Sequence, residues 1–148
     1  DDLFDNASFI MTPTENTPQE EINLIEDLAR SIHFKKVVKT TPEEHDRIIA
    51  FTSQLAHVVS NAYIKSPTHQ QQLGFSAGSF QDLTRVAKLN ENMWTPLFLM
   101  NKEPLLFEID YIMARLGEYR KAIAEDDSET LRKLLRDGRI LKETTPVD

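Results

Sequence analysis

The first forty residues combine two short apolar runs with one amphipathic stretch. Residues 8–11 (Ser-Phe-Ile-Met) are an apolar run that ends before Pro13, which predicts a buried strand. Thr17, Pro18 and Glu20 have the spacing of a capping box, and a helix is predicted behind it. Its apolar positions recur at helical spacing: Ile22, Ile25, Ala29 and Ile32. Residues 34–38 predict a second strand, so this segment is one βαβ unit, which is too small to form a stable sheet alone.

From residue 41 onward the pattern is that of helices almost throughout. Thr41, Pro42 and Glu44 form a second capping box, and no Pro or Gly follows until Pro67. We therefore expect one long helix over about 42–65. Apolar residues occupy nearly all of its faces, which predicts a central, buried helix: Ile48, Ile49, Phe51, Leu55, Ala56, Val58, Val59, Ala62 and Tyr63.

Further helices are predicted after the glycines at 74 and 78. Ser79 and Asn90 are expected N-caps of two short helices, and Pro104 is expected in the first turn of a long one. The long helix has a seam with steps of four and three: Leu105, Ile109, Ile112, Leu116, Tyr119 and Ile123. A last helix begins near Ser128. The apolar stripes are wide for one small core, which favours a subunit interface.

Composition narrows the class of protein. The chain has 148 residues, enough for one domain with a sizeable core. Its 17 basic and 24 acidic residues give a net charge of −7, which does not attract phosphate backbones or anionic lipid. Nucleic acid and membranes are therefore not expected as partners. There is no cysteine, and the first residues lack the features of a signal peptide, so we expect a cytoplasmic location.

Two histidines are candidates for chemistry. His45 and His57 lie twelve residues apart on the predicted long helix, which is about 18 Å along the axis with a rotation of roughly 120°. They cannot share a metal ion, and no metal site is expected. His45 lies among acidic residues, as is typical of a solvated helix start. His57 lies in the most apolar segment, where a buried, hydrogen-bonded structural histidine is the commoner outcome.

Residues 77–87 contain the other candidate. Gly78 and Ser79 open a helix whose free N–H groups can receive an anion. Gln81 and Arg85 are four residues apart on one face, so together they could bind one carboxylate. The alternative is a surface ion pair between Arg85 and Asp82, and the residues alone favour it. They indicate a helical domain attached to part of an α/β domain, with a candidate anion site.

Five segments of the chain form an ordered set of motifs. They are Glu44-His45-Asp46, Ser53-Gln54-Leu55-Ala56-His57, Ala77-Gly78-Ser79-Phe80-Gln81-Asp82-Leu83-Thr84-Arg85-Val86-Ala87, Met93-Trp94 and Asn101-Lys102-Glu103. In this order they resemble the motifs of the prephenate dehydrogenase family. Residues 2–4 and 9–13 also resemble the end of that family's nucleotide-binding domain, so the resemblance covers nearly the whole chain. Arogenate dehydrogenases have the same pattern.

The resemblance implies the enzyme of tyrosine biosynthesis that converts prephenate and NAD to 4-hydroxyphenylpyruvate, carbon dioxide and NADH. It implies a mainly α fold, in which residues 1–40 are the strand–helix–strand remnant of a Rossmann-type NAD-binding domain. Residues 41–148 are then an all-helical dimerisation and substrate-binding domain. The glycine-rich fingerprint for NAD or NADP and the catalytic histidine are expected before Asp1, so the fragment itself is expected to be inactive and to bind no cofactor. The implied partners are prephenate and a second copy of the chain.

The resemblance also assigns roles in substrate binding. The residues concerned are His45, His57, Gln81, Arg85 and Trp94. Arg85 matches the family's carboxylate-binding arginine. Ser79 stands where Gly is usual, Ala56 where Pro is common, and Gln81 where Arg or Lys is usual, which leaves open a preference for arogenate with its ammonium group. The remaining alternative is a non-catalytic helical dimerisation module in which these side chains are structural.

Overall fold

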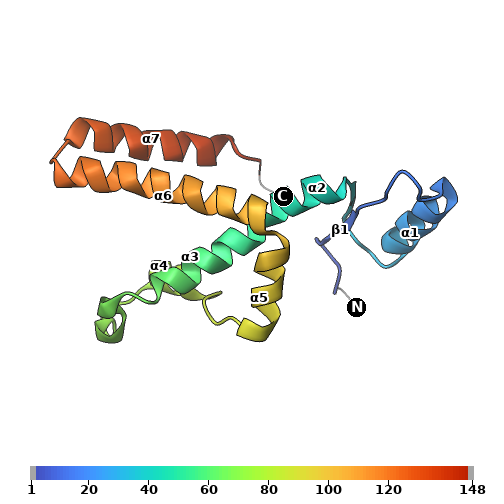
Figure 1. Cartoon of the computed structure of the whole chain (residues 1–148), viewed down its shortest axis with the longest axis horizontal. Coiled ribbons are helices and arrows are strands. Elements are labelled where there is room, and N and C mark those ends of the chain that lie inside the picture. The colour runs from blue at the N-terminus through green and yellow to red at the C-terminus, as the bar shows by residue number, and fades with distance from the viewer. Residues whose placement is uncertain (1–2, 147–148) are drawn as a thin grey trace. The chain divides into compact units, whose positions relative to one another are not determined.

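The chain is mainly α-helical and begins with a strand–helix–strand unit, as the sequence predicts (Figure 1). The computed structural model describes residues 3–146, so Asp2 of the motif at residues 2–4 lies outside the described residues. Its elements are β1 (Ser8–Met11), α1 (Gln19–Ser31), β2 (Lys36–Lys39), α2 (Pro42–Ile49), the π-helical segment η1 (Ala50–Leu55), α3 (Ala56–Tyr63), the 3-10 turn η2 (Pro67–Gln71), α4 (Gly78–Thr84), α5 (Glu91–Met100), α6 (Lys102–Ala124) and α7 (Ser128–Thr144). The chain divides into two compact units, residues 1–105 and 106–148, which are described separately.

Strands β1 and β2 form a parallel pair. Ser8 lies opposite Lys36, and Met11 lies opposite Lys39. Strand β1 coincides with the predicted apolar run, whereas β2 begins two residues later than expected. The Phe34 ring packs on Phe9 with 5.2 Å between ring centroids, so Phe34 anchors the entry to β2 instead of forming part of the strand.

One carboxylate connects α1 to β2. Glu26 of α1 pairs with Lys39 of β2 and, at 2.7 Å, with Arg30. Hydrogen bonds first from Lys39 and then from Arg30 lower the pKa of the Glu26 carboxyl. Its contribution to stability is therefore present at neutral pH and is lost as the pH falls through this lowered pKa.

Two of the predicted helix caps are confirmed. The Thr41 hydroxyl accepts a hydrogen bond from the Glu44 N–H at 3.2 Å, and Pro42 occupies the first turn of α2. Asn90 caps α5, because its side-chain oxygen accepts from the N–H groups of Asn92 and Met93. In both cases an orphan backbone donor at the helix start is satisfied.

Two other predicted caps are wrong. Helix α1 has Pro18 at its N-cap, and the Thr17 hydroxyl instead accepts from the Thr14 N–H at 3.0 Å, within the preceding turn. Helix α4 begins two residues earlier than expected, with Ala77 at the N-cap and without a side-chain cap, so Ser79 lies inside its first turn. Local turns compete for short polar side chains, which is why the spacing alone did not identify the caps.

These assignments give a matched pair of stability predictions. Thr41→Ala is expected to lower the free energy of unfolding by about 1 kcal/mol, because the Glu44 N–H loses its partner. Ser79→Ala is expected to change it by less than about 0.5 kcal/mol, because Ser79 is exposed and caps nothing. Urea unfolding of the two variants beside the wild type measures both values. Equal losses for the two would contradict the cap assignment.

The predicted long helix exists, but it is neither uniform nor buried all round. It runs as α2, η1 and α3 without a break from Pro42 to Tyr63. Ala50, Leu55 and Ser60 are buried on its inner side. Phe51 is 60% exposed, so the expectation of a fully buried helix is wrong for the single chain.

Helices α6 and α7 lie side by side and antiparallel (Figure 1). The Tyr119 hydroxyl donates to the Leu134 carbonyl at 3.3 Å and ties the two helices together. The predicted seam is not buried along its whole length, because Leu105 near its start is 5% exposed whereas Leu116 and Ile123 are 60% and 61% exposed. Leu105 and Ile123 are 18 residues apart, which is five full turns of an α-helix, so they share one face, and the far end of the seam is left uncovered in the single chain.

Candidate functional site

A histidine and the chain's one tryptophan pack together between two helices. The rings of His57 on α3 and Trp94 on α5 have their centroids 4.2 Å apart and are tilted by 32°. Phe98, one turn further along α5, lies 5.2 Å from Trp94. His57 and Trp94 are both half-buried. The structure therefore brings together two of the five residues to which the sequence assigns substrate binding.

The orientation of the His57 ring is fixed by a backbone hydrogen bond. Its Nδ1 lies 2.8 Å from the Ser53 carbonyl oxygen, which can only accept, so Nδ1 carries the proton. In the neutral ring Nε2 is then an acceptor. Within residues 3–146 Nε2 makes no hydrogen bond and stays accessible to solvent. His57 thus makes the structural hydrogen bond that its apolar surroundings predicted, through Nδ1, and keeps Nε2 as a free acceptor.

Helix α4 is anchored to the same helix one turn after His57. The Ser60 hydroxyl donates to the Leu83 carbonyl at 2.7 Å, and the Asn61 side chain donates to the Ala87 carbonyl at 2.9 Å. His57, Ser60 and Asn61 share one face of α3 because they are three and four residues apart. Arg85 lies between the two tied carbonyls in the sequence. The end of α4 that carries Arg85 is therefore held within about one helical turn of His57 along α3.

Arg85 lies at the far end of helix α4 from the helix start. It is the exposed C-cap of the seven-residue helix α4, so the free N–H groups at Gly78 lie at the opposite end, about 10 Å away along the axis. The prediction that Gln81 and Arg85 bind one carboxylate stays a prediction. The alternative of an ion pair between Arg85 and Asp82 is wrong, because across the described chain the Arg85 side chain has no ionic or hydrogen-bonding partner.

Gln81 and His45 are not joined to the His57–Trp94 pair. Gln81 is exposed on α4, one turn before Arg85. His45 lies in the first turn of α2, where its Nδ1 is 2.9 Å from a carboxylate oxygen of Asp46. The intervening π-helical segment η1 makes the sequence-based estimate of the rotation between His45 and His57 invalid, since that estimate assumed a continuous α-helix.

Sequence reasoning missed the residues that hold these elements together. Ser60 and Asn61 join α3 to α4, and Gln54 and Asn101 form a buried amide pair beside η1. Gln54 and Asn101 belong to two of the motifs described above, which gave them no role. Ser60 and Asn61 were marked only as polar residues within an apolar segment. Such residues are hydrogen-bonded when buried, but the sequence does not show to which partners.

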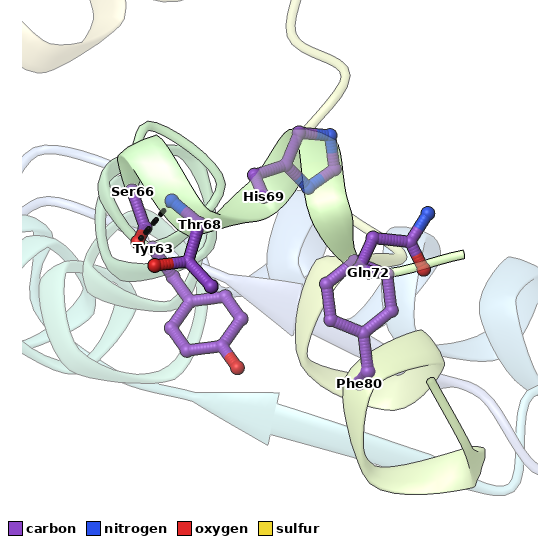
Figure 2. Close-up of a pocket in the computed structure, with 6 residues that line it drawn as sticks. All are labelled: Tyr63, Ser66, Thr68, His69, Gln72 and Phe80. Atoms are coloured by element: carbon purple, nitrogen blue, oxygen red, sulfur yellow. Dashed lines mark hydrogen bonds between the residues drawn. The ribbon is translucent and has the colours of Figure 1, made fainter. Parts of the chain in front are cut away.

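A small cavity lies apart from the predicted residues (Figure 2). It has a volume of about 150 Å³ and is lined by Tyr63, Ser66, Thr68, His69, Gln72 and Phe80. The rings of His69 and Phe80 are nearly parallel, with centroids 5.9 Å apart, and the His69 Nδ1 atom is buried without a hydrogen-bond partner. His69 is not among the candidate residues of the sequence, and it is half-buried.

Within residues 3–146, potential metal ligands do not gather in groups of three or more. In the same range, every helix is too short or too polar to cross a membrane.

The fold and site together define a mainly helical domain that follows a βαβ unit and carries a histidine–tryptophan pair between two helices. Residues 41–137 match the family model described as "Prephenate dehydrogenase, dimerization domain". The chain therefore belongs to the prephenate dehydrogenase family.

Individual relatives agree with this assignment. The prephenate dehydrogenase of Bacillus subtilis (strain 168) is 28% identical over 152 residues, which cover 98% of this chain and 40% of the relative. The cyclohexadienyl dehydrogenase of Zymomonas mobilis is 33% identical over 136 residues, which cover 88% of this chain and 46% of the relative. The chain thus spans less than half the length of these relatives.

Solved structures show the same fold. The prephenate dehydrogenase of Aquifex aeolicus, in complex with hydroxyphenyl propionate and NAD+, superposes with a TM-score of 0.83 at 26% identity. The match covers 96% of this chain and 51% of that one. The arogenate dehydrogenase of Synechocystis has a TM-score of 0.80 at 24% identity, covering 96% of this chain and 53% of that one.

Proposed function

We propose that this chain is the C-terminal part of a prephenate dehydrogenase, which we call the complete enzyme. In this proposal residues 1–40 end the NAD-binding domain, and residues 41–148 form the helical domain for dimerisation and substrate binding. The observation that carries the proposal is the His57–Trp94 pair, with the Arg85 end of α4 tied to α3 one turn away. It places a hydrogen-bond acceptor, an aromatic surface and a nearby cation on three helices that pack together.

These groups suit prephenate, a dicarboxylate with a hydroxylated six-membered ring. The exposed guanidinium of Arg85 can bind one carboxylate bidentately. The His57 Nε2 atom can accept a hydrogen bond from substrate, and Trp94 offers a flat apolar surface for the ring. Gln81 and His45 are proposed to lie further out in the same pocket. Positioning of this kind supplies much of the rate enhancement in a reaction driven by aromatisation.

The reaction requires NAD, and the β1–α1–β2 unit of this chain has no glycine from which to build a dinucleotide-binding turn. Prephenate gives up a hydride to NAD+ and loses one carboxylate, so the products are 4-hydroxyphenylpyruvate, carbon dioxide and NADH. The four glycines of the chain lie at 74, 78, 117 and 138, all outside the β1–α1–β2 unit, so that unit does not carry the glycine-rich dinucleotide turn. In our proposal the rest of the complete enzyme binds NAD or NADP.

Gln81 favours arogenate dehydrogenase as the second candidate function. Arogenate has an ammonium group where prephenate has a keto group, and a neutral amide at position 81 would not repel it, whereas a cation would. The test compares kcat/KM of the complete enzyme for prephenate and for arogenate, followed by NADH absorbance with NAD+ in excess. We expect the higher value with prephenate. Activity with arogenate alone would establish the second candidate, and NADH formation from neither substrate would contradict both.

A separate prediction concerns the 148-residue chain by itself. Purified alone, it is expected to form no NADH from prephenate and NAD+, because its βαβ unit lacks the dinucleotide turn. The same assay with the complete enzyme at equal concentration is the positive control. NADH formation by the 148-residue chain would show that it contains a cofactor site that the proposal places elsewhere.

A further inference from the structure

Two buried amide side chains form a connected polar network beside the π-helical segment. Gln54 and Asn101 are 6% and 8% exposed. The Asn101 amide nitrogen donates to the Asp46 carbonyl and to the Gln54 side-chain oxygen, both at 2.8 Å. The Gln54 amide nitrogen lies 3.4 Å from the Leu97 carbonyl oxygen, to which it donates. Buried amides are costly unless they are paired, so this network favours one arrangement of the helices that it joins.

The network connects the same two helices as the His57–Trp94 pair. Gln54 precedes His57 by three residues in the continuous helix, and Leu97 follows Trp94 by three residues on α5. The Gln54–Leu97 hydrogen bond and the ring contact are therefore two ties between these helices, about one turn apart. We therefore expect the loss of the Gln54–Leu97 hydrogen bond to alter the contact between the His57 and Trp94 rings.

The π-helical segment determines which way His57 faces. Each residue of an α-helix turns the chain by about 100°, so a π-helical turn with one extra residue changes the direction of every side chain that follows it. Gln54 lies within η1, and the Asp46 carbonyl that Asn101 binds lies on the turn before η1. The network thus joins the turn before η1 to η1 itself and favours the π-helical arrangement over a regular helix.

We propose that Gln54, together with Asn101, is a positioning residue that holds the π-helical turn and thereby keeps His57 against Trp94. The role of this pair in binding substrate rests on the proposed function, whereas its geometry does not. The competing view is that the amide pair only stabilises the fold. The two views predict different results for a folded variant that lacks the amide pair. The positioning role predicts a weakened His57–Trp94 contact, and the purely stabilising role predicts an unchanged one.

Trp94 provides the test, because it is the only tryptophan of the 148-residue chain. A protonated imidazole in contact with an indole quenches its fluorescence, so Trp94 emission is recorded from about pH 8 down to about pH 5. Wild-type emission is expected to fall over this range, and His57→Asn is expected to abolish the fall. Gln54→Met, which keeps the length of the side chain and loses its polar groups, is expected to reduce the fall at least about twofold.

A control separates positioning from stability. Thr41→Ala lowers stability through the α2 cap without touching the network, so it is expected to lower Tm and leave the pH-dependent fall unchanged. A full pH-dependent fall in Gln54→Met, with only Tm lowered, would overturn the positioning role.

The complete enzyme then tests the link to function. Gln54→Met is expected to lower kcat/KM for prephenate about 10-fold and to leave the KM for NAD+ unchanged. A weakened fluorescence change with unaltered kinetics would overturn the role of the His57–Trp94 pair in substrate binding, which is part of the proposed function. The role of Gln54 in positioning His57 would stand.

Discussion

Replacing Arg85 by alanine is expected to raise the KM of the complete enzyme for prephenate by about 30- to 700-fold. The proposed substrate is a dianion, and a guanidinium that meets one carboxylate bidentately contributes about 2–4 kcal/mol once both are shielded from water. Arg85 is exposed and unpaired within the described chain, so its loss should not lower Tm. Steady-state kinetics with NAD+ in excess, recorded beside the melting curve of the same variant, measures both effects.

Two further variants define the controls for Arg85. Arg85→Lys is expected to recover only part of the affinity, because the charge remains and the planar fork is lost. Lys88→Ala removes an exposed cation three residues away and is expected to change KM by less than about twofold. An unchanged KM in Arg85→Ala would remove Arg85 from the substrate site.

Replacing Leu116 by aspartate is expected to weaken dimerisation by about 100-fold or more. The family model that matches residues 41–137 describes a dimerisation domain, and we expect a homodimer. Leu116 is 60% exposed in the single chain and belongs to a broad set of exposed apolar side chains on α6 and α7. That set comprises Leu106, Phe107, Tyr111, Met113, Leu116, Ile123, Leu135, Ile140 and Leu141. Stable interfaces of this kind bury upwards of about 2,000 Å², and an unpaired charge within one costs about 3 kcal/mol or more.

Sedimentation equilibrium of the 148-residue chain measures this effect. In the isolated chain the new carboxylate at position 116 faces water, so the fold of the chain itself is spared. Arg132→Asp introduces the same side chain on the charged part of α7, beside Lys133 and Arg136, and is expected to leave assembly unchanged. A wild-type chain that stays monomeric at micromolar concentration would contradict the dimer.

Sequence signals that act over only a few residues predicted the elements well. The apolar run of β1 and the caps Thr41 and Asn90 are of this kind, because each depends on neighbours within four residues. Thr17 and Ser79 failed because a turn and an earlier helix start altered the local geometry. The π-helical segment was not predictable, since its residues suit an α-helix equally well.

The arrangement of the candidate site depends on partners far apart in the chain. Ser60 and Asn61 bind carbonyls 23 and 26 residues away, and Gln54 pairs with Asn101 at a separation of 47 residues. Periodicity indicates that such residues are on a helix, but it does not indicate which carbonyl they reach. Motif resemblance pointed to His57 and Trp94 separately, and the structure added that their rings are in contact.

The proposal that α3, α4 and α5 bind prephenate is tested most directly by the NMR signal of the Trp94 indole N–H. In the complete enzyme, with nitrogen-labelled tryptophan, this signal is identified by its absence from the Trp94→Phe variant. We expect saturating prephenate to shift it in the wild-type enzyme, and to shift it in Arg85→Ala only at much higher concentration. A Trp94 signal that stays in place while the wild-type enzyme is saturated with prephenate would contradict the account.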